Sequence, residues 1–209
     1  MKKLVLSVLT FFSVSVSSGF TQTTGTHNGH EWVDLGLSVK WATRNVGAYN
    51  DLGPGDKFYY GETTVKSKAN PTRMSGVSIK SIAGNKLFDA AAANWGGSWR
   101  IPTWQNFREL IDCCTWTSYT AEGRDFIKAT SKINGSCIYF PLPDSHRHSR
   151  VRATVVYEGY YWSSTFDGNS GGCARFFRWV SGSGGWGEAD ASLQWFDFST
   201  ACLIRPVLD

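Results

Sequence analysis

Residues 95–110 read WGGSWRIPTWQNFREL, and this stretch carries the strongest helix signal in the chain. Pro102 restricts the backbone just ahead of the helix, and Thr103 supplies a hydroxyl that suits an N-cap. The apolar residues that follow share the i, i+3, i+4 and i+7 spacing of one helix face: Phe107, Leu110, Ile111 and Cys114. The stretch therefore predicts an amphipathic helix that begins after Thr103.

A second, shorter helix is expected just before this stretch, and strands on both sides of the pair. Asp89 is placed to cap residues 90–95, and Gly96 can end that helix in a left-handed conformation. Residues 63–86 are polar and weakly patterned, which is typical of a long loop. The segments expected as strands are HEWVDLGLSVKWATRNVG (two strands around Gly36), DKFYYGET, DFIKAT, SCIYFPLP, EGYYWSSTF, CARFFRWV and ACLIRPVL. This order of strands, two helices and strands predicts an α+β fold with an antiparallel sheet.

The N-terminus has the three zones of a secretory signal peptide. Lys2 and Lys3 precede an apolar run from Leu4 to Val16, and small residues follow it. A short membrane anchor is the alternative, although the run is shorter than a comfortable bilayer span. We expect residues 1–19 to be the signal peptide, 20–29 a flexible lead-in and 30–209 one domain. The mature chain is expected to be secreted or displayed at the cell surface, peripheral to a membrane at most.

Charge and composition do not indicate a nucleic-acid partner. Removal of Lys2 and Lys3 lowers Lys plus Arg from 21 to 19 against 17 acidic residues, which leaves the mature chain near +2. The densest basic cluster, HRHSRVR at 146–152, lacks the interleaved aromatic residues of a stacking platform and is interpreted as a solvated loop. The chain has 10 Trp, 8 Tyr and 13 Phe beside 22 Gly. This composition favours many short strands with wide, flat side chains in the core or on a surface.

Several motifs in order resemble the Fibrobacter succinogenes major paralogous domain. The matching segments are HEWVDLGLSVKWATRNVG, YYGET, AAANWGGSWRIPT, ELIDCCTWT, EGYYWSST and IRPV, from about His30 to Val207. WRIPT with Phe107 also resembles the Arg-Leu-Pro-Thr-x-x-x-Trp motif of formylglycine-generating-enzyme-like proteins. The resemblance implies a C-type-lectin-like fold, with a twisted antiparallel sheet, two flanking helices and long loops. Structural roles are expected for Arg100, Pro102, Thr103, Phe107, Trp162 and Arg205, with Arg100 anchoring a partly buried charge network.

A cysteine oxidase of the formylglycine-generating type is the alternative function. Such enzymes use a cysteine pair near the C-terminus, and the late cysteines here are Cys173 and Cys202. Both lie in expected strands, where core packing or a mutual disulfide is the commoner role. Arg175 and Arg205 are near them in sequence, and either could lower a thiol pKa. We expect no catalytic residue, and the odd number of cysteines leaves the pairing open.

No metal or cofactor is expected. His146 and His148 are spaced to share one strand face, but only Asp144 accompanies them, so a loop pair without metal is favoured. Calcium-dependent lectins usually carry Glu-Pro-Asn or Gln-Pro-Asp, whereas this chain has Leu142 in the place of the liganding residue. A calcium-dependent lectin site is therefore disfavoured.

Residues 175–200 are the candidate ligand-binding surface. Rigid aromatic residues mixed with small polar ones are typical of binding surfaces. The alternative is that these aromatic residues pack in the core or along an edge strand. The candidate ligand-contacting residues are Trp186, Glu188, Asp190, Gln194, Trp195, Phe196 and Asp197. The resemblance extends to the variable proteins of diversity-generating retroelements, which randomise this region, so the expected partner is a surface protein or a glycan.

Overall fold

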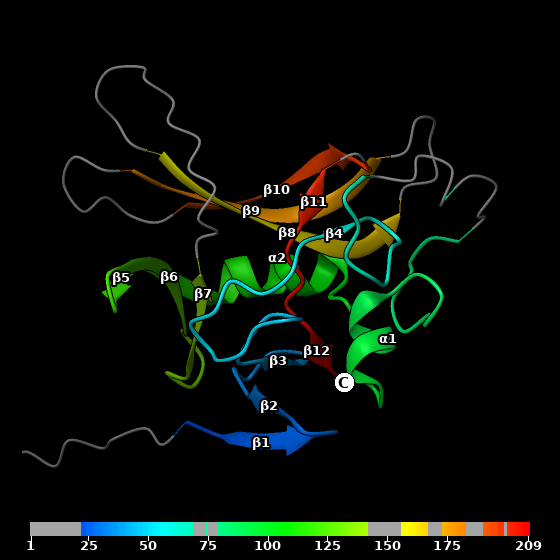
Figure 1. Ribbon diagram of the computed structural model, residues 1–209. Coiled ribbons are helices and arrows are strands. Elements are labelled where there is room, and N and C mark those ends of the chain that lie inside the picture. The colour runs from blue at the N-terminus through cyan, green and yellow to red at the C-terminus, as the bar shows by residue number, and fades with distance from the viewer. Residues whose placement is uncertain are drawn as a thin grey trace, which may run out of the picture.

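The computed structural model describes residues 22–68, 74, 79–141, 156–166, 173–182, 190–198 and 200–209. These residues form short strands around two helices (Figure 1). The elements in chain order are β1 (Thr24–His27), β2 (His30–Val33), β3 (Lys40–Ala42), β4 (Phe58–Tyr59), α1 (Ala90–Trp95), α2 (Trp104–Cys113), β5 (Cys114–Ala121), β6 (Arg124–Ser131), β7 (Cys137–Pro141), β8 (Val156–Phe166), β9 (Cys173–Gly182), β10 (Asp190–Asp197), β11 (Ala201–Cys202) and β12 (Val207–Leu208).

The named strands pair antiparallel and form four sheets. Their orders are β1-β2-β3-β12, β10-β9-β8, β5-β6-β7 and β11-β4. Because β12 pairs with β3, the first and last strands of the domain belong to one sheet. This mixed, strand-rich architecture agrees with the predicted α+β class and its antiparallel pairing.

The helix α1 is held by one buried carboxylate at its N-cap. Asp89 is fully buried, and its oxygens accept hydrogen bonds from the amides of Ala92 at 3.0 Å, Gly84 at 2.7 Å and Ile101 at 2.9 Å. Burial raises the pKa of Asp89, and the bonds from these amides oppose that rise. At the other end Gly96 has φ 66° and ψ −159°: the positive φ favours glycine, as expected, but the ψ differs from that of the left-handed C-cap. One side chain thus joins the loop before α1 to the WRIPT segment after it.

The helix α2 begins at the residue predicted from the sequence. The hydroxyl of Thr103 accepts from the Asn106 amide at 3.2 Å, and the Asn106 side-chain oxygen accepts from the Thr103 amide at 3.0 Å. This reciprocal pair is a capping box. Pro102 is buried, and its carbonyl accepts a 2.7 Å bond from the amide of Ser164 in β8. The helix start is therefore joined to the β8 strand as well as capped.

The predicted apolar stripe of α2 ends one residue too late. Phe107 and Leu110 are fully buried, but Cys114 adopts φ −116° and ψ 154° and begins β5. Cys114 remains 2% exposed, so its burial is as expected while its conformation is not. No strand is predicted from the sequence at β5, although Thr115, Trp116 and Thr117 are residues that favour strands. The apolar spacing at 114 concealed the change from helix to strand.

Two apolar clusters form the core. One joins α1 to β4 and the C-terminal end of the chain, and its largest members are Trp95, Trp99, Trp162, Phe58 and Tyr60. The other surrounds α2, and its largest members are Trp41, Phe107, Phe140, Tyr161 and Ile127. Figure 1 shows α2 between the β8–β9–β10 sheet and the strands β3 and β12, so this helix covers one face of each.

A fully buried guanidinium connects its own C-terminal segment with two others, residues 42–45 and the strand β7. Arg205 donates to the Asn45 side-chain oxygen at 2.7 Å, to the carbonyls of Ala42 at 3.0 Å and Thr43 at 2.7 Å, and to the carbonyl of Tyr139 at 2.7 Å. Burial lowers the pKa of Arg205 from its usual value. Neutral acceptors surround the charge and compensate for its lost hydration. Arg205 therefore has the structural setting expected from its place in IRPV.

The expected flexible lead-in over residues 20–29 is wrong for residues 24–27, which form β1. The strand is fixed from outside its own sequence: the His27 carbonyl accepts from the Trp99 indole at 2.9 Å, and the His27 ring accepts from the Ser98 amide at 3.1 Å. Gly97 makes this close approach possible, because a Cβ built there would lie 2.4 Å from the His27 ring nitrogen. Contacts with distant residues therefore order β1, and the polar sequence of the segment gives no sign of them.

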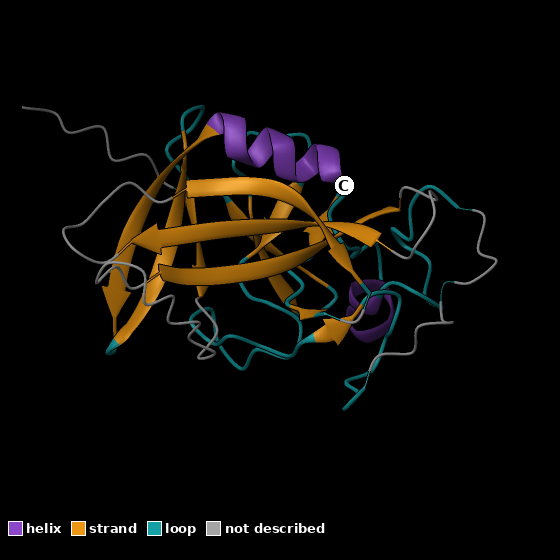
Figure 2. Cartoon of the chain, turned by 90° about the horizontal axis from the view of Figure 1, so that it is seen from above, coloured by secondary structure: helices purple, strands orange, loops and turns teal. Residues whose placement is uncertain are grey.

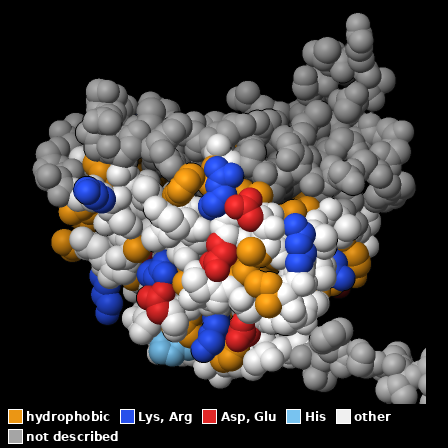
Figure 3. Space-filling view, turned by 180° about the vertical axis from the view of Figure 1, so that it is seen from behind, with side chains coloured by type: hydrophobic (Ala, Val, Ile, Leu, Met, Phe, Trp, Pro, Cys, Tyr) orange, Lys and Arg blue, Asp and Glu red, His pale blue; other side chains and the backbone are white. Residues whose placement is uncertain are grey.

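The back of the molecule shows a mixed surface (Figure 3). In the described part of that face, basic and acidic side chains alternate, and hydrophobic side chains occur singly or in small groups. Exposed hydrophobic residues such as Tyr49 and Leu87 are in loops. A face of this kind gives no sign of a single-charge patch.

We predict that Arg205→Met lowers the free energy of unfolding by more than about 3 kcal/mol, because the variant leaves several buried acceptors without a donor. Arg205→Lys is expected to recover little of the loss, since one ammonium cannot reach all four acceptors of the guanidinium. Denaturant titration measures both changes. Arg100→Met is the control, and it should lose about 1 kcal/mol or less because its partner Asp209 is exposed. Equal losses for the variants at 205 and 100 would contradict the assigned role.

Acid is predicted to weaken the fold through His30. Its ring stacks on Trp95 at 3.8 Å, and its Nδ1 is buried with no hydrogen-bond partner. Desolvation, and then the charge of Arg44, lower the pKa of His30 below 6.5. Below about pH 6.5 the unfolded chain therefore binds more protons at this residue than the folded chain, so stability falls as the pH falls.

The expected loss from His30 is under about 1 kcal/mol, because the side chain is only partly buried. Urea titrations at about pH 7.5 and pH 5 would measure it. His30→Phe keeps an aromatic ring on Trp95 and should show a smaller decrease than the parent chain. An unchanged decrease in that variant would assign the acid sensitivity to other groups.

Candidate ligand-binding surface

The predicted surface lies on the antiparallel strands β9 and β10. Their register places Trp195 opposite Arg175 and Asp197 opposite Cys173, and β9 pairs in turn with β8. Five of the seven predicted ligand-contacting residues are in β10: Asp190, Gln194, Trp195, Phe196 and Asp197. The other two, Trp186 and Glu188, lie outside the described residues.

The register divides the predicted residues between the two faces of β10. Leu193 packs against the core cluster around α2. Alternate strand positions share a face, so positions 195 and 197 fall on the face of Leu193. Positions 190, 194 and 196 fall on the opposite face. The β10 backbone thus assigns Asp190, Gln194 and Phe196 to the face away from α2.

One end of this sheet is fixed by an aromatic anchor, which we define as Tyr60, Trp162, Phe166 and Phe198. Tyr60 and Phe198 stack with centroids 5.3 Å apart, and Phe166 and Phe198 stack at 6.0 Å. Trp162 is 1% exposed and donates from its indole to the Phe58 carbonyl at 2.7 Å. The anchor therefore holds β8 and the residue that follows β10 against β4. Trp162 is a structural residue here.

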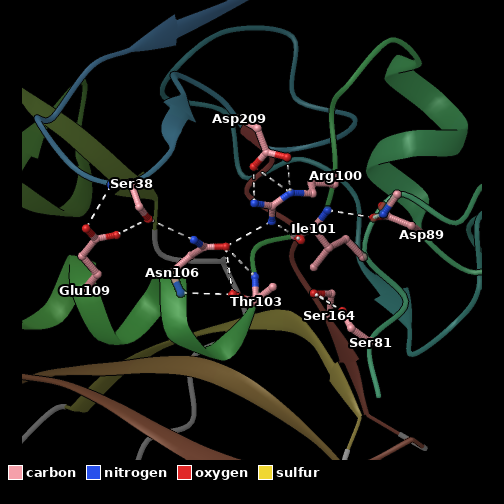
Figure 4. A network of polar contacts seen from close by, with 11 residues as sticks. Ser38, Ser81, Asp89, Arg100, Ile101, Thr103, Asn106, Glu109, Ser164 and Asp209 are labelled. Atoms are coloured by element: carbon pink, nitrogen blue, oxygen red, sulfur yellow. Dashed lines mark hydrogen bonds and ion pairs between the residues drawn. The ribbon is translucent and has the colours of Figure 1, made fainter. Parts of the chain in front are cut away.

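Arg100 pairs with the C-terminal residue and with the α2 capping box (Figure 4). Its guanidinium donates to the Asp209 carboxylate and, at 3.1 Å, to the Asn106 side-chain oxygen. The hydrogen bond from Arg100 is the main reason that the pKa of Asp209 lies below its usual value. The side chain of Arg100 is 15% exposed, so the charge is partly buried, as the sequence analysis anticipated.

The same contacts continue along α2. The side-chain amide of Asn106 donates to the Ser38 hydroxyl at 3.4 Å. Ser38 in turn donates from its hydroxyl and its backbone amide to the Glu109 carboxylate. Figure 4 shows these side chains in a chain of polar contacts from Asp209 to Glu109. Each charged group in it pairs with another group of the network. Arg100 is thereby occupied with structure and does not point to a reacting group.

Two of the described thiols, those of Cys114 and Cys202, have the properties of core residues. Cys202 is buried, and burial raises its pKa well above the usual value; nearby Lys57 only partly opposes this. Burial also raises the pKa of Cys114 to about 12. Cys202 is a free thiol, so the open possibility of a Cys173–Cys202 bridge is not realised. A cysteine nucleophile needs a lowered pKa, which Cys202 lacks.

Metal-ligating side chains do not cluster in the part of the chain that the structure describes, where no group of three or more His, Cys, Asp or Glu could hold an ion. The sequence candidates Leu142, Asp144, His146 and His148 lie outside the described residues.

A second sheet also has an exposed face: its strands β6 and β7 fall on the expected strands DFIKAT and SCIYFPLP, whereas β5 was not predicted. The sheet β5-β6-β7 carries Tyr119, which is 41% exposed, and Tyr139 beside it. The alternation in TWTSYT at 115–120 is a period-2 signal that would have indicated β5. It was missed because the helix stripe was extended to Cys114.

Comparison of this chain with protein-family models, with curated proteins and with solved structures finds no match in any of the three. Among the described residues, neither helix is long and apolar enough to cross a membrane.

We predict that the thiols divide into two classes of reactivity. Cys113 and Cys137 are partly exposed and should react with iodoacetamide in the native protein, whereas Cys114 and Cys202 should react only on unfolding. Mass spectrometry of the labelled peptides would identify each site, and the same labelling in denaturant provides the control. Rapid native labelling of Cys202 would contradict its burial and favour the oxidase alternative.

Proposed function

We propose that this chain is an exported binding domain that carries out no chemistry. It has a C-type-lectin-like fold and contacts a surface protein or a glycan through β9, β10 and the segment that joins them. The proposal combines the resemblance found in the sequence with the geometry of the β8–β9–β10 sheet.

The fold assignment is supported by the arrangement of the helices and of the chain ends. Two helices flank antiparallel sheets, and β1 and β12 lie in one sheet. The WRIPT segment and the IRPV segment, which carry the resemblance, meet directly: Arg100 and Val207 form a β-bridge, with bonds of 3.1 and 2.9 Å between their backbones. Motifs that are far apart in the sequence thus form one structural unit.

The observation that carries the binding proposal is how the β8–β9–β10 sheet is held. Its inner face rests on α2 through Tyr161 and Leu193, and its end is fixed by the aromatic anchor. Figure 2 shows the three strands side by side in front of the rest of the described chain. A rigid support on one face and at one end is what a binding surface requires.

The absence of chemistry is supported by the state of the candidate reactive groups. Cys202 is buried and its pKa is raised, so it is not held as a thiolate. The guanidinium of Arg205 donates instead to neutral acceptors, Asn45 and Tyr139 among them. Arg100 is paired with Asp209. The oxidase alternative is therefore the weaker proposal.

Export and diversification complete the proposal. The N-terminal pattern supports secretion or surface display, and the position of residues 175–200 just before IRPV supports a place among retroelement variable proteins. Genomic sequence tests the second part: a template repeat and a reverse transcriptase gene beside this gene would support it, and the lack of both would remove it.

The binding test uses the mature chain, residues 20–209, on arrays of glycans and of extracellular proteins. We expect at least one specific binder whose signal falls about tenfold or more in Trp186→Ala and in a Gln194→Ala, Phe196→Ala double variant, because positions 194 and 196 lie on the face of β10 away from α2. Surface plasmon resonance with the purified binder would give the change in affinity.

Tyr49→Ala is the matched control, because Tyr49 is 74% exposed and lies in a loop far along the chain from β9 and β10. It should leave binding unchanged. Thermal melting of each variant separates lost contact from lost folding. The proposal fails if every binder tolerates the β10 variants, or if the chain oxidises a cysteine-containing peptide and Cys202→Ala abolishes that activity in a folded protein.

A further inference from the structure

The outward face of the β5–β6–β7 sheet has the composition of a second binding site. The register aligns Thr117, Lys128 and Tyr139 in one row across the three strands. The opposite face belongs to the core, where Ile127 and Phe140 are fully buried. Since alternate residues share a face, the row of Lys128 points away from the core.

Two tyrosines and an amine form one unit on this face. The rings of Tyr119 and Tyr139 lie 4.9 Å apart and are tilted by 46°, and the Lys128 Nζ lies 6.0 Å from the Tyr139 ring centroid. Tyr119 is 41% exposed, and Thr115 and Thr117 are exposed beside it. Flat rings, hydroxyls and a cation are thus available together on a sheet surface.

The charge on this face has one sign. Arg124 is exposed and lies four residues before Lys128, so both cations occupy the same face of β6. The exposed or partly exposed residues at the outward positions are Thr115, Thr117, Tyr119, Ala121, Arg124, Lys128, Thr130, Cys137 and Tyr139, with no carboxylate among them; Phe126 and Pro141, which share their register face, are buried. The mixed charges of the back of the molecule in Figure 3 provide a contrast.

We propose that this outward face binds a carboxylated oligosaccharide, one built from uronic acid residues. The tyrosine rings would pack against the apolar faces of the sugar rings, Lys128 and Arg124 would pair with the carboxylates, and Thr117 would exchange hydrogen bonds with the hydroxyls. Strand faces that combine rings and polar groups hold oligosaccharides in other folds. Lys128 supplies both a charge and a hydrogen-bond donor next to the ring on which the sugar would pack.

Two other polyanions are less suited to this face. A single-stranded nucleic acid carries a phosphate on every nucleotide and is bound along a continuous basic groove, whereas the described outward positions carry two cations, Lys128 and Arg124. An acidic peptide is usually bound along a sheet edge or in a groove, not across a flat face. Both polymers carry the negative charge that Lys128 and Arg124 attract, so both belong in the test.

This site is separate from the surface of the proposed function. It lies on β5, β6 and β7, which belong to a different sheet from β9 and β10. Variants of one sheet test one proposal and leave the other intact, so the failure of one is distinguishable from the failure of the other.

The experiment is calorimetric titration of the mature chain with oligomers of galacturonate, of mannuronate and guluronate, and of the glucuronate-containing hyaluronan. We expect at least one to bind with a dissociation constant below about 1 mM, and the methyl ester of a bound galacturonate to bind at least tenfold more weakly. Polyglutamate and oligo-dT of equal charge are the comparison polymers and should also bind at least tenfold more weakly.

Lys128→Gln and Tyr119→Ser should each weaken binding about tenfold, whereas Glu122→Gln, which removes the carboxylate of the β5–β6 turn, should strengthen it about twofold. Lys86→Gln and Tyr49→Ser are the matched controls, since both side chains are exposed in loops, and they should have no effect. Thermal melting confirms that each variant is folded.

Three results would overturn the proposal: no binding of any uronate below about 1 mM, equal binding of polyglutamate or oligo-dT, or binding that survives both Lys128→Gln and Tyr119→Ser. Equal binding of all polyanions would indicate general charge attraction, and preferred binding of oligo-dT or polyglutamate would assign the face to that polymer.

Discussion

The buried guanidinium of Arg205 is the constraint on which the rest of the structure depends. Removing such a charge from water is costly, and the cost is offset only while every donor has an acceptor. The acceptors come from Ala42, Thr43, Asn45 and Tyr139, on segments that lie apart in the sequence. The Tyr161 hydroxyl accepts a hydrogen bond from the side-chain amide of Asn45 and so joins β8 to the acceptors of Arg205. Burial raises the pKa of Tyr161 to about 12. Arg205 is thus satisfied only when both ends and the middle of the chain are in place.

The WRIPT segment performs a similar task with weaker groups. Asp89 holds the amide of Ile101, Pro102 accepts from β8, and Thr103 starts α2. Arg100 then fixes the chain end through an exposed carboxylate, where solvent screens the attraction. Burial therefore ranks the two arginines: one is required for assembly of the core, and the other adjusts the chain end. That difference explains how two arginines can both be structural yet unequal in their effect on stability.

Local sequence signals predicted the elements that local chemistry determines. Asp89, Thr103 and Gly96 act at the helix ends through side chains or conformations that can be inferred from a few residues. Elements fixed by distant contacts were missed: β1 depends on Trp99 and Ser98, some seventy residues later, and β5 follows a helix stripe without a break. In the candidate site, β9 coincides with the expected strand CARFFRWV, whereas β10, its partner, was not among the expected strands. The face on which each residue of β10 lies is set by its pairing in the sheet. No motif in residues 175–200 predicts that position 195 faces the core while positions 194 and 196 face away.

The anchors also hold both limits of the segment between β8 and β11, where we propose the binding surface. Before it, Trp162 is bonded to Phe58, and after it Cys202 pairs with the same residue in the β4–β11 ladder. Both limits of the segment are therefore held by β4, whatever residues lie between them. Substitutions on the outward face of a strand held in this way change stability by only about 0.5 kcal/mol each, whereas substitutions at the anchors remove buried contacts. If this segment binds a ligand as proposed, substitutions between the two anchors would change its ligand preference while the core, the helices and Arg205 remain as they are.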